Sequence, residues 1–323
     1  MERARTIAVL PECQEQEKGR LQAALGAGDR LIFCGERGLS DLAERDSVDV
    51  VFGEPELADI LRLPRLRWIQ MTWAGANKYT AEPSFPRDLT LTSASGAFGM
   101  TIAEYVIAGV LALYRLLFSY RQQLQGGQWQ ELEGENTLEG KRAVVLGIGN
   151  VGQETAKRLK AFACSTVGIS RRAKEKPDCF DELHTMEELD DQLALADLVI
   201  LTLPGTEETR GLFGEARLRR IKRGALLVNV GRGFIVDTEA LTKTLKEGRL
   251  GGAVLDVMEP EPLPPEHPLR HMEKVLLTPH ISGISWGTNL CTRSRILDIF
   301  TENLRLDKDG QPLSHRIDLN RGY

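Results

Sequence analysis

The sequence predicts an α/β protein of two domains, the larger built on a doubly wound parallel sheet and the smaller on a second parallel α/β unit. Three observations lead to this prediction. The chain has 323 residues, too many for one ordinary hydrophobic core. Short apolar runs alternate with polar stretches of helical length, which is the order of strands and crossover helices in parallel sheets. The runs after residue 142 are continuously apolar, as strands covered on both faces are.

Five predicted strands in the first hundred residues define the smaller domain. Each is a short run rich in β-branched or aromatic residues, and the polar stretch after the first can form a helix. The last two strands lead into glycine-containing turns. The five runs are TIAVL (6–10), RLIFCG (30–35), VDVVFG (48–53), LRWIQM (66–71) and LTLTS (89–93).

A long helix is predicted over 101–120, TIAEYVIAGVLALYRLLFSY. Thr101 and Glu104 form a T-x-x-E capping box in front of the apolar run, so the helix is expected to open at Thr101. Its nearly all-round apolar surface predicts burial on every side, at the domain junction or in a subunit interface. Glu104 and Arg115 interrupt the run, whereas a membrane span needs about 20 nearly uncharged residues. We therefore expect no membrane segment here.

Six further strands are predicted in the larger domain, with helices at 151–162, near 214–222 and at 237–247. The helical stretch 284–310 follows the last strand and can return the chain to the first domain. We assign 101–284 to the larger domain, and 1–100 with 285–323 to the smaller. The six runs are AVVLGIG (143–149), STVGIS (165–170), ADLVILTLP (196–204), GALLVNVG (224–231), LGGAVLDV (250–257) and VLLTP (275–279).

Composition and charge exclude several classes of partner. The formal net charge of -5 offers no basic stripe for nucleic acid, so a small-molecule partner is expected. The five cysteines are scattered and form no C-x-x-C pair, and the N-terminal apolar run is shorter than a signal-peptide core, which together favour a cytoplasmic protein. His267 and His271 are four residues apart, but Pro268 intervenes and no third ligand is evident, so no metal is predicted.

A glycine fingerprint follows the first strand of the larger domain. Gly147, Gly149 and Gly152 form G-x-G-x-x-G between a predicted strand and a predicted helix. In that context the first glycine permits a tight turn, the second a close approach of pyrophosphate, and the third close packing of the helix. Asn150 and Val151 lie at the helix N-terminus, whose amides and dipole attract phosphate. The fingerprint predicts a Rossmann dinucleotide-binding domain.

The end of the second strand of that domain carries GISRR (168–172). An acidic residue that binds the adenosine ribose in NAD enzymes is expected near this position, but Ser170, Arg171 and Arg172 stand there instead. Two guanidiniums and a hydroxyl suit a 2′-phosphate, which a carboxylate would repel. The stretch therefore predicts a preference for NADP(H), with NAD(H) possible. The alternative is that RRAKEK is only a solvated basic loop.

Charged side chains follow three more predicted strands. Arg232 lies in LLVNVGRGFIVD, Asp256 and Glu261 in GGAVLDVMEPEPLP, and His280 in VLLTPHISG. In a doubly wound sheet the carboxyl ends of the strands border the ligand crevice, so these groups are expected to converge. A single histidine after a strand is more often structural than catalytic, and Arg232 and Glu261 each have an ordinary surface role available. Their joint occurrence at strand ends favours a catalytic site.

These motifs resemble those of the D-isomer-specific 2-hydroxyacid dehydrogenases, which combine the glycine fingerprint with N-x-x-R-G, D-V-x-x-x-E-P and P-H-x-x-G. The resemblance extends from the long helix to about residue 283, and the closing RIDLNRGY is similar to a tail found in the family. In appearance the chain is closest to the NADPH-dependent glyoxylate/hydroxypyruvate reductase branch. The resemblance implies that the smaller domain is flavodoxin-like and that the protein is a homodimer.

The same resemblance implies a role for each catalytic residue. His280 would protonate the substrate carbonyl oxygen as hydride arrives, with Glu261 paired to its imidazole, since a neighbouring carboxylate favours the protonated ring. Arg232 would bind the substrate carboxylate and polarise its carbonyl. In the first domain TWAGANKY resembles the loop whose amides, at Ala74, Gly75 and Ala76, bind the substrate carboxylate, and Trp73 would wall the pocket or pack in the fold.

Further cofactor positions are implied at the strand ends of the larger domain. They are Leu203, Pro204, Thr209, Val230, Gly231, Asp256, Ser282 and Gly283. Two departures from the family pattern stand out. Ala163 replaces a customary glycine after the fingerprint helix, and ISGISW replaces the commoner T-x-E after the histidine, which affects the expected surroundings of Ser285 and Trp286.

The sequence thus predicts a cytoplasmic NADPH-preferring reductase of small 2-oxo acids, with two domains that close over the substrate. A different class of function remains open, namely a dinucleotide-sensing binding protein on the same fold. Within the enzyme class, activity on 3-phosphoglycerate or D-lactate also remains open. A phosphoglycerate site should carry extra basic residues in the loops of the first domain, where TWAGANKY offers only Lys78.

Overall fold

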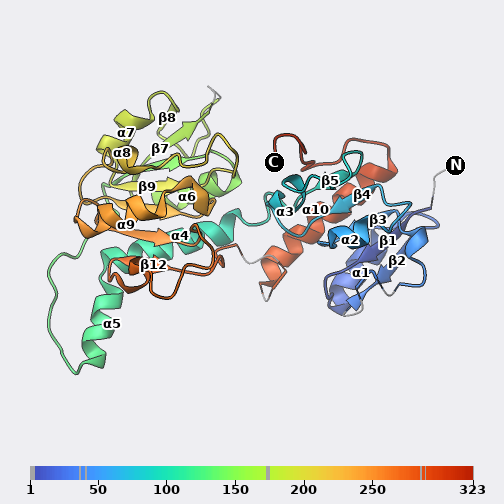
Figure 1. Cartoon of the computed structure of the whole chain (residues 1–323), viewed down its shortest axis with the longest axis horizontal. Helices are drawn as coiled ribbons and strands as arrows, with labels where there is room; N and C mark the ends of the chain where they lie inside the picture. The colour runs from blue at the N-terminus through green and yellow to red at the C-terminus, as the bar shows by residue number, and fades with distance from the viewer. Residues whose placement is uncertain are drawn as a thin grey trace. The chain divides into compact units, whose positions relative to one another are not determined.

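The computed structural model describes residues 4–35, 38–40, 42–171, 175–283, 286–287 and 289–322. The chain divides into two compact units, Met1–Phe98 with Ile284–Tyr323, and Gly99–Gly283. Each unit has its own parallel sheet, of five strands in the first and seven in the second within these described ranges (Figure 1). The predicted fold class of two parallel-sheet α/β domains is confirmed.

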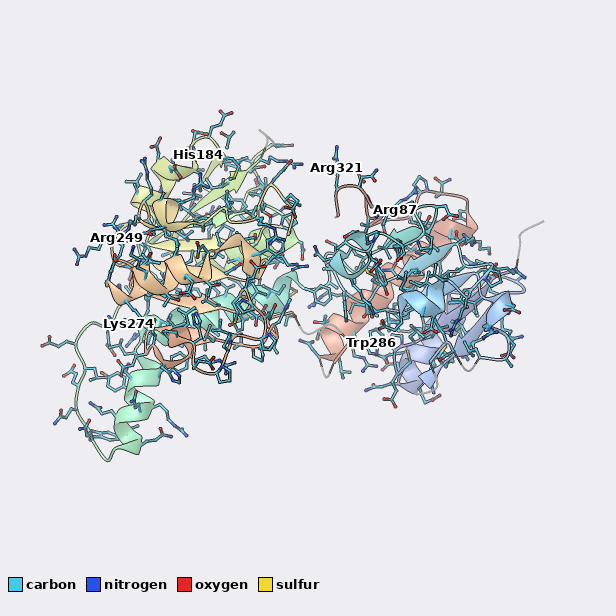
Figure 2. The ribbon with its side chains drawn as sticks, viewed as in Figure 1. Arg87, His184, Arg249, Lys274, Trp286 and Arg321 are labelled. Atoms are coloured by element: carbon cyan, nitrogen blue, oxygen red, sulfur yellow. The ribbon has the colours of Figure 1, made fainter. Side chains whose placement is uncertain are left out.

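The sheet of the second unit is doubly wound. Its order is β12-β11-β10-β9-β6-β7-β8, so the chain enters at the middle, runs out to β8 and then returns through β9 to β12. Lys274, just before β12, and His184, on β8, mark its two edges (Figure 2). The strands are β6 (Arg142–Leu146), β7 (Ser165–Ser170), β8 (Glu182–Thr185), β9 (Leu198–Leu201), β10 (Leu226–Asn229), β11 (Gly252–Leu255) and β12 (Val275–Leu277).

Helices cover both faces of this sheet. Alternate residues of a strand point to opposite faces, so Ala143 and Val145 join the core under α4 and α6, while Val144 and Leu146 join the core under α7, α8 and α9. Both cores are fully buried, which explains the continuous apolar runs in the sequence. The helices are α4 (Gly99–Tyr114), α6 (Asn150–Ala161), α7 (Leu189–Leu195), α8 (Glu215–Leu218) and α9 (Thr238–Lys246), with 3-10 turns η3 (Gly233–Ile235) and η4 (Pro268–His271).

The structure corrects the predicted helix over 101–120. The helix opens at Gly99, so Thr101 and Glu104 lie inside it and form no capping box. It ends at Tyr114, because Leu116 adopts a left-handed conformation (φ 52°), and α5 (Leu117–Gln125) follows at a bend of 58°. In α4 one face is buried within the second unit, while Met100 and Glu104 are exposed in the single chain, so burial of the remaining surface in an interface stays a prediction.

The apolar character of this region does not produce a single long helix. Among the described residues, none of the individual helices has both the length and the hydropathy required to cross a membrane. The bent pair α4 and α5 meets those two criteria only when its two helices are counted together.

The first unit is a five-stranded sheet of order β2-β1-β3-β4-β5. On one face Phe300 of α10 stacks on Phe52 at 4.3 Å between ring centroids and contacts Trp68 at 5.6 Å. Trp286 donates its Nε1–H to the carbonyl of Glu12 and meets Phe52 edge-on. The elements are β1 (Thr6–Val9), α1 (Glu15–Ala23), β2 (Arg30–Phe33), η2 (Arg45–Ser47), β3 (Val50–Phe52), α2 (Leu57–Ile60), β4 (Trp68–Gln70), α3 (Asn77–Thr80), β5 (Thr90–Thr92) and α10 (Leu290–Lys308).

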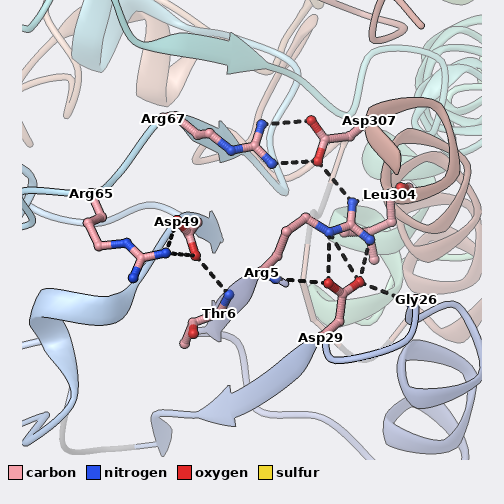
Figure 3. Close-up of polar contacts among 9 residues, drawn as sticks. All are labelled: Arg5, Thr6, Gly26, Asp29, Asp49, Arg65, Arg67, Leu304 and Asp307. Atoms are coloured by element: carbon pink, nitrogen blue, oxygen red, sulfur yellow. Dashed lines mark hydrogen bonds and ion pairs between the residues drawn. The ribbon is translucent and has the colours of Figure 1, made fainter. Parts of the chain in front are cut away.

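A buried ionic cluster fastens α10 to the start of this sheet (Figure 3). Arg5 donates from Nε to Asp29 at 3.1 Å and from Nη1 to Asp307 at 2.9 Å, and Arg67 meets both oxygens of Asp307 at 2.7 Å. Burial opposes ionisation, but the hydrogen bonds from Arg67 and Arg5 hold the pKa of Asp307 below its usual value. Arg5 lies just before β1 and Asp307 lies in α10, so the cluster joins the beginning of the chain to its last helix. Removing one partner would leave a buried charge uncompensated.

Candidate active site

Close backbone contacts shape the glycine turn between β6 and α6. Gly147 has a φ of 99°, where L side chains are strained, and a Cβ there would lie 2.8 Å from Thr202 Oγ1. A Cβ on Gly152 would lie 1.9 Å from the carbonyl oxygen of Gly147, so no side chain fits. A Cβ on Gly149 would meet nothing within 4 Å. The turn is thus closed on its inner side and open in front of Gly149.

The groups around that open side come from the neighbouring strand ends. Asn150 and Val151 form the first turn of α6. Ser170 is the last residue of β7 and is only 7% exposed, whereas the side chain of Arg171 is half exposed and pairs with Glu208 at 2.8 Å. The position of Arg172 falls outside the described residues. These contacts place one of the two predicted guanidiniums at the end of β7.

The loop after β9 is held as a compact turn. Thr209 Oγ1 donates to the carbonyl of Pro204 at 2.9 Å and accepts from the amide of Thr206 at 2.9 Å. A Cβ on Gly231, in the loop after β10, would lie 2.8 Å from the carbonyl oxygen of Leu203, so the two loops are in backbone contact. Leu203, Pro204, Thr209, Val230 and Gly231 therefore lie along one rim, at the carboxyl end of the sheet.

The three predicted catalytic side chains lie together in the second unit. His280 Nδ1 lies 3.3 Å from Glu261 Oε1, although one side chain follows β12 and the other β11. Burial lowers the pKa of the Arg232 guanidinium, and the nearby Glu261 carboxylate partly opposes that shift. The Glu261 carboxylate thus contacts the imidazole and acts electrostatically on the Arg232 guanidinium.

The loop that carries Arg232 is shaped by a buried asparagine. Asn229, only 1% exposed, accepts from the amide of Gly231 at 3.1 Å and donates to the carbonyl of Arg232 at 3.0 Å. The stem of Arg232 packs against Gly205, where a Cβ would lie 2.7 Å from Arg232 Cγ. These contacts fix the direction in which the guanidinium leaves the strand.

Asp256 organises the loop that carries His280. Its buried carboxylate accepts from Thr278 Oγ1 at 2.6 Å, from the amide of Ile281 at 2.8 Å and from the amide of Ser282 at 2.9 Å. Its backbone carbonyl accepts from the amide of His280 at 2.9 Å. His280 has a φ of 56°, a conformation that a non-glycine residue keeps only where its surroundings hold it. The backbone of the histidine is therefore held by Asp256.

A pocket of about 640 Å³ opens beside the imidazole in the second unit. Its polar lining comes from Glu261, Arg270, Thr278 and His280, and the hydroxyl of Thr278 lies 2.6 Å from Tyr105 Oη. The volume lies in the range of small-molecule sites, which are mostly apolar with a few convergent polar groups. The lining residues are Met258, Glu261, Pro262, Leu263, Arg270, Leu277, Thr278, Pro279 and His280.

The predicted substrate loop of the first unit is anchored by a half-buried carboxylate, that of Glu54. Glu54 accepts from the amides of Thr72 at 2.6 Å and Trp73 at 3.2 Å. Burial raises the pKa of Glu54, while the hydrogen bonds from Thr72 and Trp73 act in the opposite direction. Among the described residues no hydrogen bond is found from the amides of the range 74–76, of which Ala76 is buried at 2% exposure.

The second unit, which carries the glycine turn and the clustered His, Glu and Arg, matches a known protein family. Residues 107–282 match the family model of the D-isomer specific 2-hydroxyacid dehydrogenases, in their NAD-binding domain. The chain belongs to this family. The prediction of an NAD(P)-dependent dehydrogenase is confirmed.

Individual relatives of this dehydrogenase agree with that assignment. A glyoxylate reductase of Thermofilum pendens is 33% identical over 280 residues, which cover 83% of the chain and 80% of the relative. A solved family member from Aeromonas salmonicida has a TM-score of 0.86 and 34% identity, covering 98% of the chain and all of that structure. An NADPH-dependent glyoxylate/hydroxypyruvate reductase from Sinorhizobium meliloti, solved with NADP and sulfate, has a TM-score of 0.82 and 26% identity, covering 99% and 100% of the two chains.

Several residues that position the site of the dehydrogenase were not predicted from the sequence. Glu54 directly follows Gly53 at the end of β3, and an acidic residue at such a strand end could have been singled out. Thr278 and Tyr105 carry no such signal, because their roles depend on α4 lying against β12. Glu208 is one of two adjacent acids in a polar loop, and the sequence does not distinguish it from Glu207.

Proposed function

We propose that the protein reduces small 2-oxo acids of the glyoxylate and hydroxypyruvate type to D-2-hydroxy acids with NADPH as the preferred reductant. The contact that carries the proposal is the 3.3 Å approach of His280 Nδ1 to Glu261, whose carboxylate also acts electrostatically on Arg232. The glyoxylate reductases among the relatives support the substrate class. The NADP bound to the Sinorhizobium meliloti reductase supports the cofactor.

The residues of the turn and of the strand ends would hold the dinucleotide. The open side of Gly149 and the amides of Asn150 and Val151 suit its pyrophosphate, and Arg171 suits a 2′-phosphate. When bound, the nicotinamide supplies the hydride. Asp256 serves this site by holding the loop of His280, Ser282 and Gly283 in place.

The side chains then have separate tasks in the reduction. Arg232 orients the 2-oxo acid by a two-pronged contact with its carboxylate and draws electron density toward the carbonyl oxygen. His280, protonated and held by Glu261, gives its proton to that oxygen, and the group that results is the hydroxyl of the product. We assign the amides of the range 74–76 in the first unit to the substrate carboxylate as well.

The proposal is tested by following the absorbance of NADPH with a panel of glyoxylate, hydroxypyruvate, pyruvate and 3-phosphohydroxypyruvate. We expect the highest kcat/KM on glyoxylate or hydroxypyruvate. His280→Ala should lower kcat by about 10²- to 10⁴-fold, the usual contribution of a general acid, while the Kd for NADPH stays unchanged. Binding of NADPH without turnover on any member would favour the dinucleotide-sensing alternative, and preferential turnover of the phosphorylated acid would identify a phosphoglycerate-type enzyme.

A further inference from the structure

Arg171 and Glu208 form an ion pair across the carboxyl end of β6. Arg171 directly follows β7, and Glu208 lies in the loop after β9. Both strands pair with β6, one on each side. Arg171 Nη1 lies 2.8 Å from Glu208 Oε2. The pair therefore spans the strand from which the glycine turn begins.

The loop after β9 directs its two adjacent acids, Glu207 and Glu208, to different partners. Thr209 closes the turn through Pro204 and Thr206, as described above. Glu207 then lies 3.5 Å from Arg210, whose guanidinium packs at 4.2 Å on the ring of Phe234. Glu208 is directed to Arg171 instead. The loop after β9 thus brings the Glu208 carboxylate to the end of β7, where the sequence of β7 itself has no acidic residue.

The chemistry of this arrangement suits both forms of the dinucleotide. A carboxylate at the ribose accepts a hydrogen bond from the 2′-hydroxyl of NAD(H), which is the task of the acid at the end of the second strand in NAD enzymes. The same carboxylate repels the 2′-phosphate of NADP(H) and competes with it for the Arg171 guanidinium. The Arg171 and Glu208 side chains are 51% and 70% exposed, and an exposed pair of this kind contributes little to stability, so a phosphate can displace it.

We propose that Glu208 is a specificity-determining residue, which competes with the 2′-phosphate for Arg171 and accepts the ribose hydroxyl of NAD(H). The inference rests on the proposed binding of the 2′-phosphate by Arg171. Glu208 thereby lowers the preference for NADPH and lets the enzyme use NADH. Because the interaction is electrostatic and lies near solvent, its strength should fall as ionic strength rises.

The test is calorimetric titration of the full chain with adenosine 2′,5′-bisphosphate and with adenosine 5′-monophosphate. Removing one like charge in a largely aqueous setting should tighten binding of the bisphosphate to Glu208→Gln by about fivefold to tenfold. Binding of the monophosphate should weaken, and kcat/KM for NADPH over that for NADH should rise by at least the same factor. Glu207→Gln is the matched control, because its carboxylate faces Arg210, and it should bind both ligands as the parent protein does.

The outcomes separate this inference from the proposed function. If Glu208→Gln binds both nucleotides as the parent does, while the parent still favours the bisphosphate and Arg171→Ala abolishes that preference, the role of Glu208 is refuted and the 2′-phosphate site stands. If Arg171→Ala leaves the affinity for the bisphosphate unchanged, the contact of Arg171 with the 2′-phosphate is refuted, and the role of Glu208 is refuted with it. Equal effects of the Glu207→Gln and Glu208→Gln changes would also overturn the inference, since they would reflect net charge alone.

Discussion

Replacing Asp256 by asparagine exchanges one oxygen of a buried carboxylate for an amide nitrogen, and we expect this change to remove most of the turnover. The carboxylate accepts three hydrogen bonds, from Thr278, Ile281 and Ser282. An asparagine retains one acceptor oxygen, and its NH₂ group then faces a backbone amide that also donates. The loop of His280 must shift to relieve that conflict.

The size of the effect follows from those contacts. A buried hydrogen bond to a charged group contributes about 1.5–3 kcal/mol, and an unsatisfied buried amide costs a further 1–3 kcal/mol, roughly. A loss of about 3 kcal/mol in positioning His280 corresponds to a decrease in kcat of about 100-fold. The assay is steady-state reduction of glyoxylate by NADPH, together with the thermal midpoint of unfolding, Tm.

Asp197→Asn provides a matched control at the opposite end of the same sheet. Asp197 also accepts from a backbone amide, that of Arg142 at 2.9 Å, and it pairs with Lys222 at 2.7 Å. This change should lower Tm without lowering kcat. A parent-like kcat in Asp256→Asn, or equal losses of kcat in both variants, would refute the argument that Asp256 holds the histidine loop.

Three further predictions follow from other residues. Ala163 has a φ of 59°, so Ala163→Gly should stabilise the fold by about 0.5–1 kcal/mol, and a lower Tm would contradict this. Because the pKa of Glu54 is raised, the native state binds the proton more tightly than the unfolded state. The Tm of the parent protein should therefore fall relative to that of Glu54→Gln as the pH rises above 4.5, the ordinary pKa of a glutamate. A difference in Tm that stays constant with pH would contradict a raised pKa. Phe118 and Leu124 are 42% and 50% exposed on α5, so replacing both with serine should convert the predicted homodimer to a monomer in light scattering, and an unchanged mass would exclude this surface.

The sequence predicted those features of the dehydrogenase that short stretches of chain determine. The turn at Gly147 needs a residue tolerant of positive φ, and Gly152 admits no side chain, so both leave a local signal. Burial on both faces likewise gives the central strands continuous apolar runs. The grouping of Arg232, Glu261 and His280 was predicted because parallel strands bring their carboxyl ends to one edge.

Features that depend on tertiary contacts escaped prediction. Strand β8 reads ELHT and is not among the six runs predicted for the larger domain, because it is a half-buried edge strand held by ion pairs. Its Glu182 meets Arg142 at 2.7 Å, and its His184 lies between Glu182 and Glu188, whose hydrogen bonds raise the pKa of the imidazole. The break between α4 and α5 at Leu116 could not be predicted, because no glycine or proline stands there.

The docking of α10 in the first unit has a consequence for biosynthesis. The aromatic ring of Phe300 that covers Phe52 and Trp68 leaves the ribosome only after the whole of the second unit has been made. Since domains generally fold as units during synthesis, the contiguous second unit can fold first, while the five-stranded sheet waits with one face uncovered. Nascent chains stalled before residue 290 should therefore recruit chaperones through the N-terminal segment.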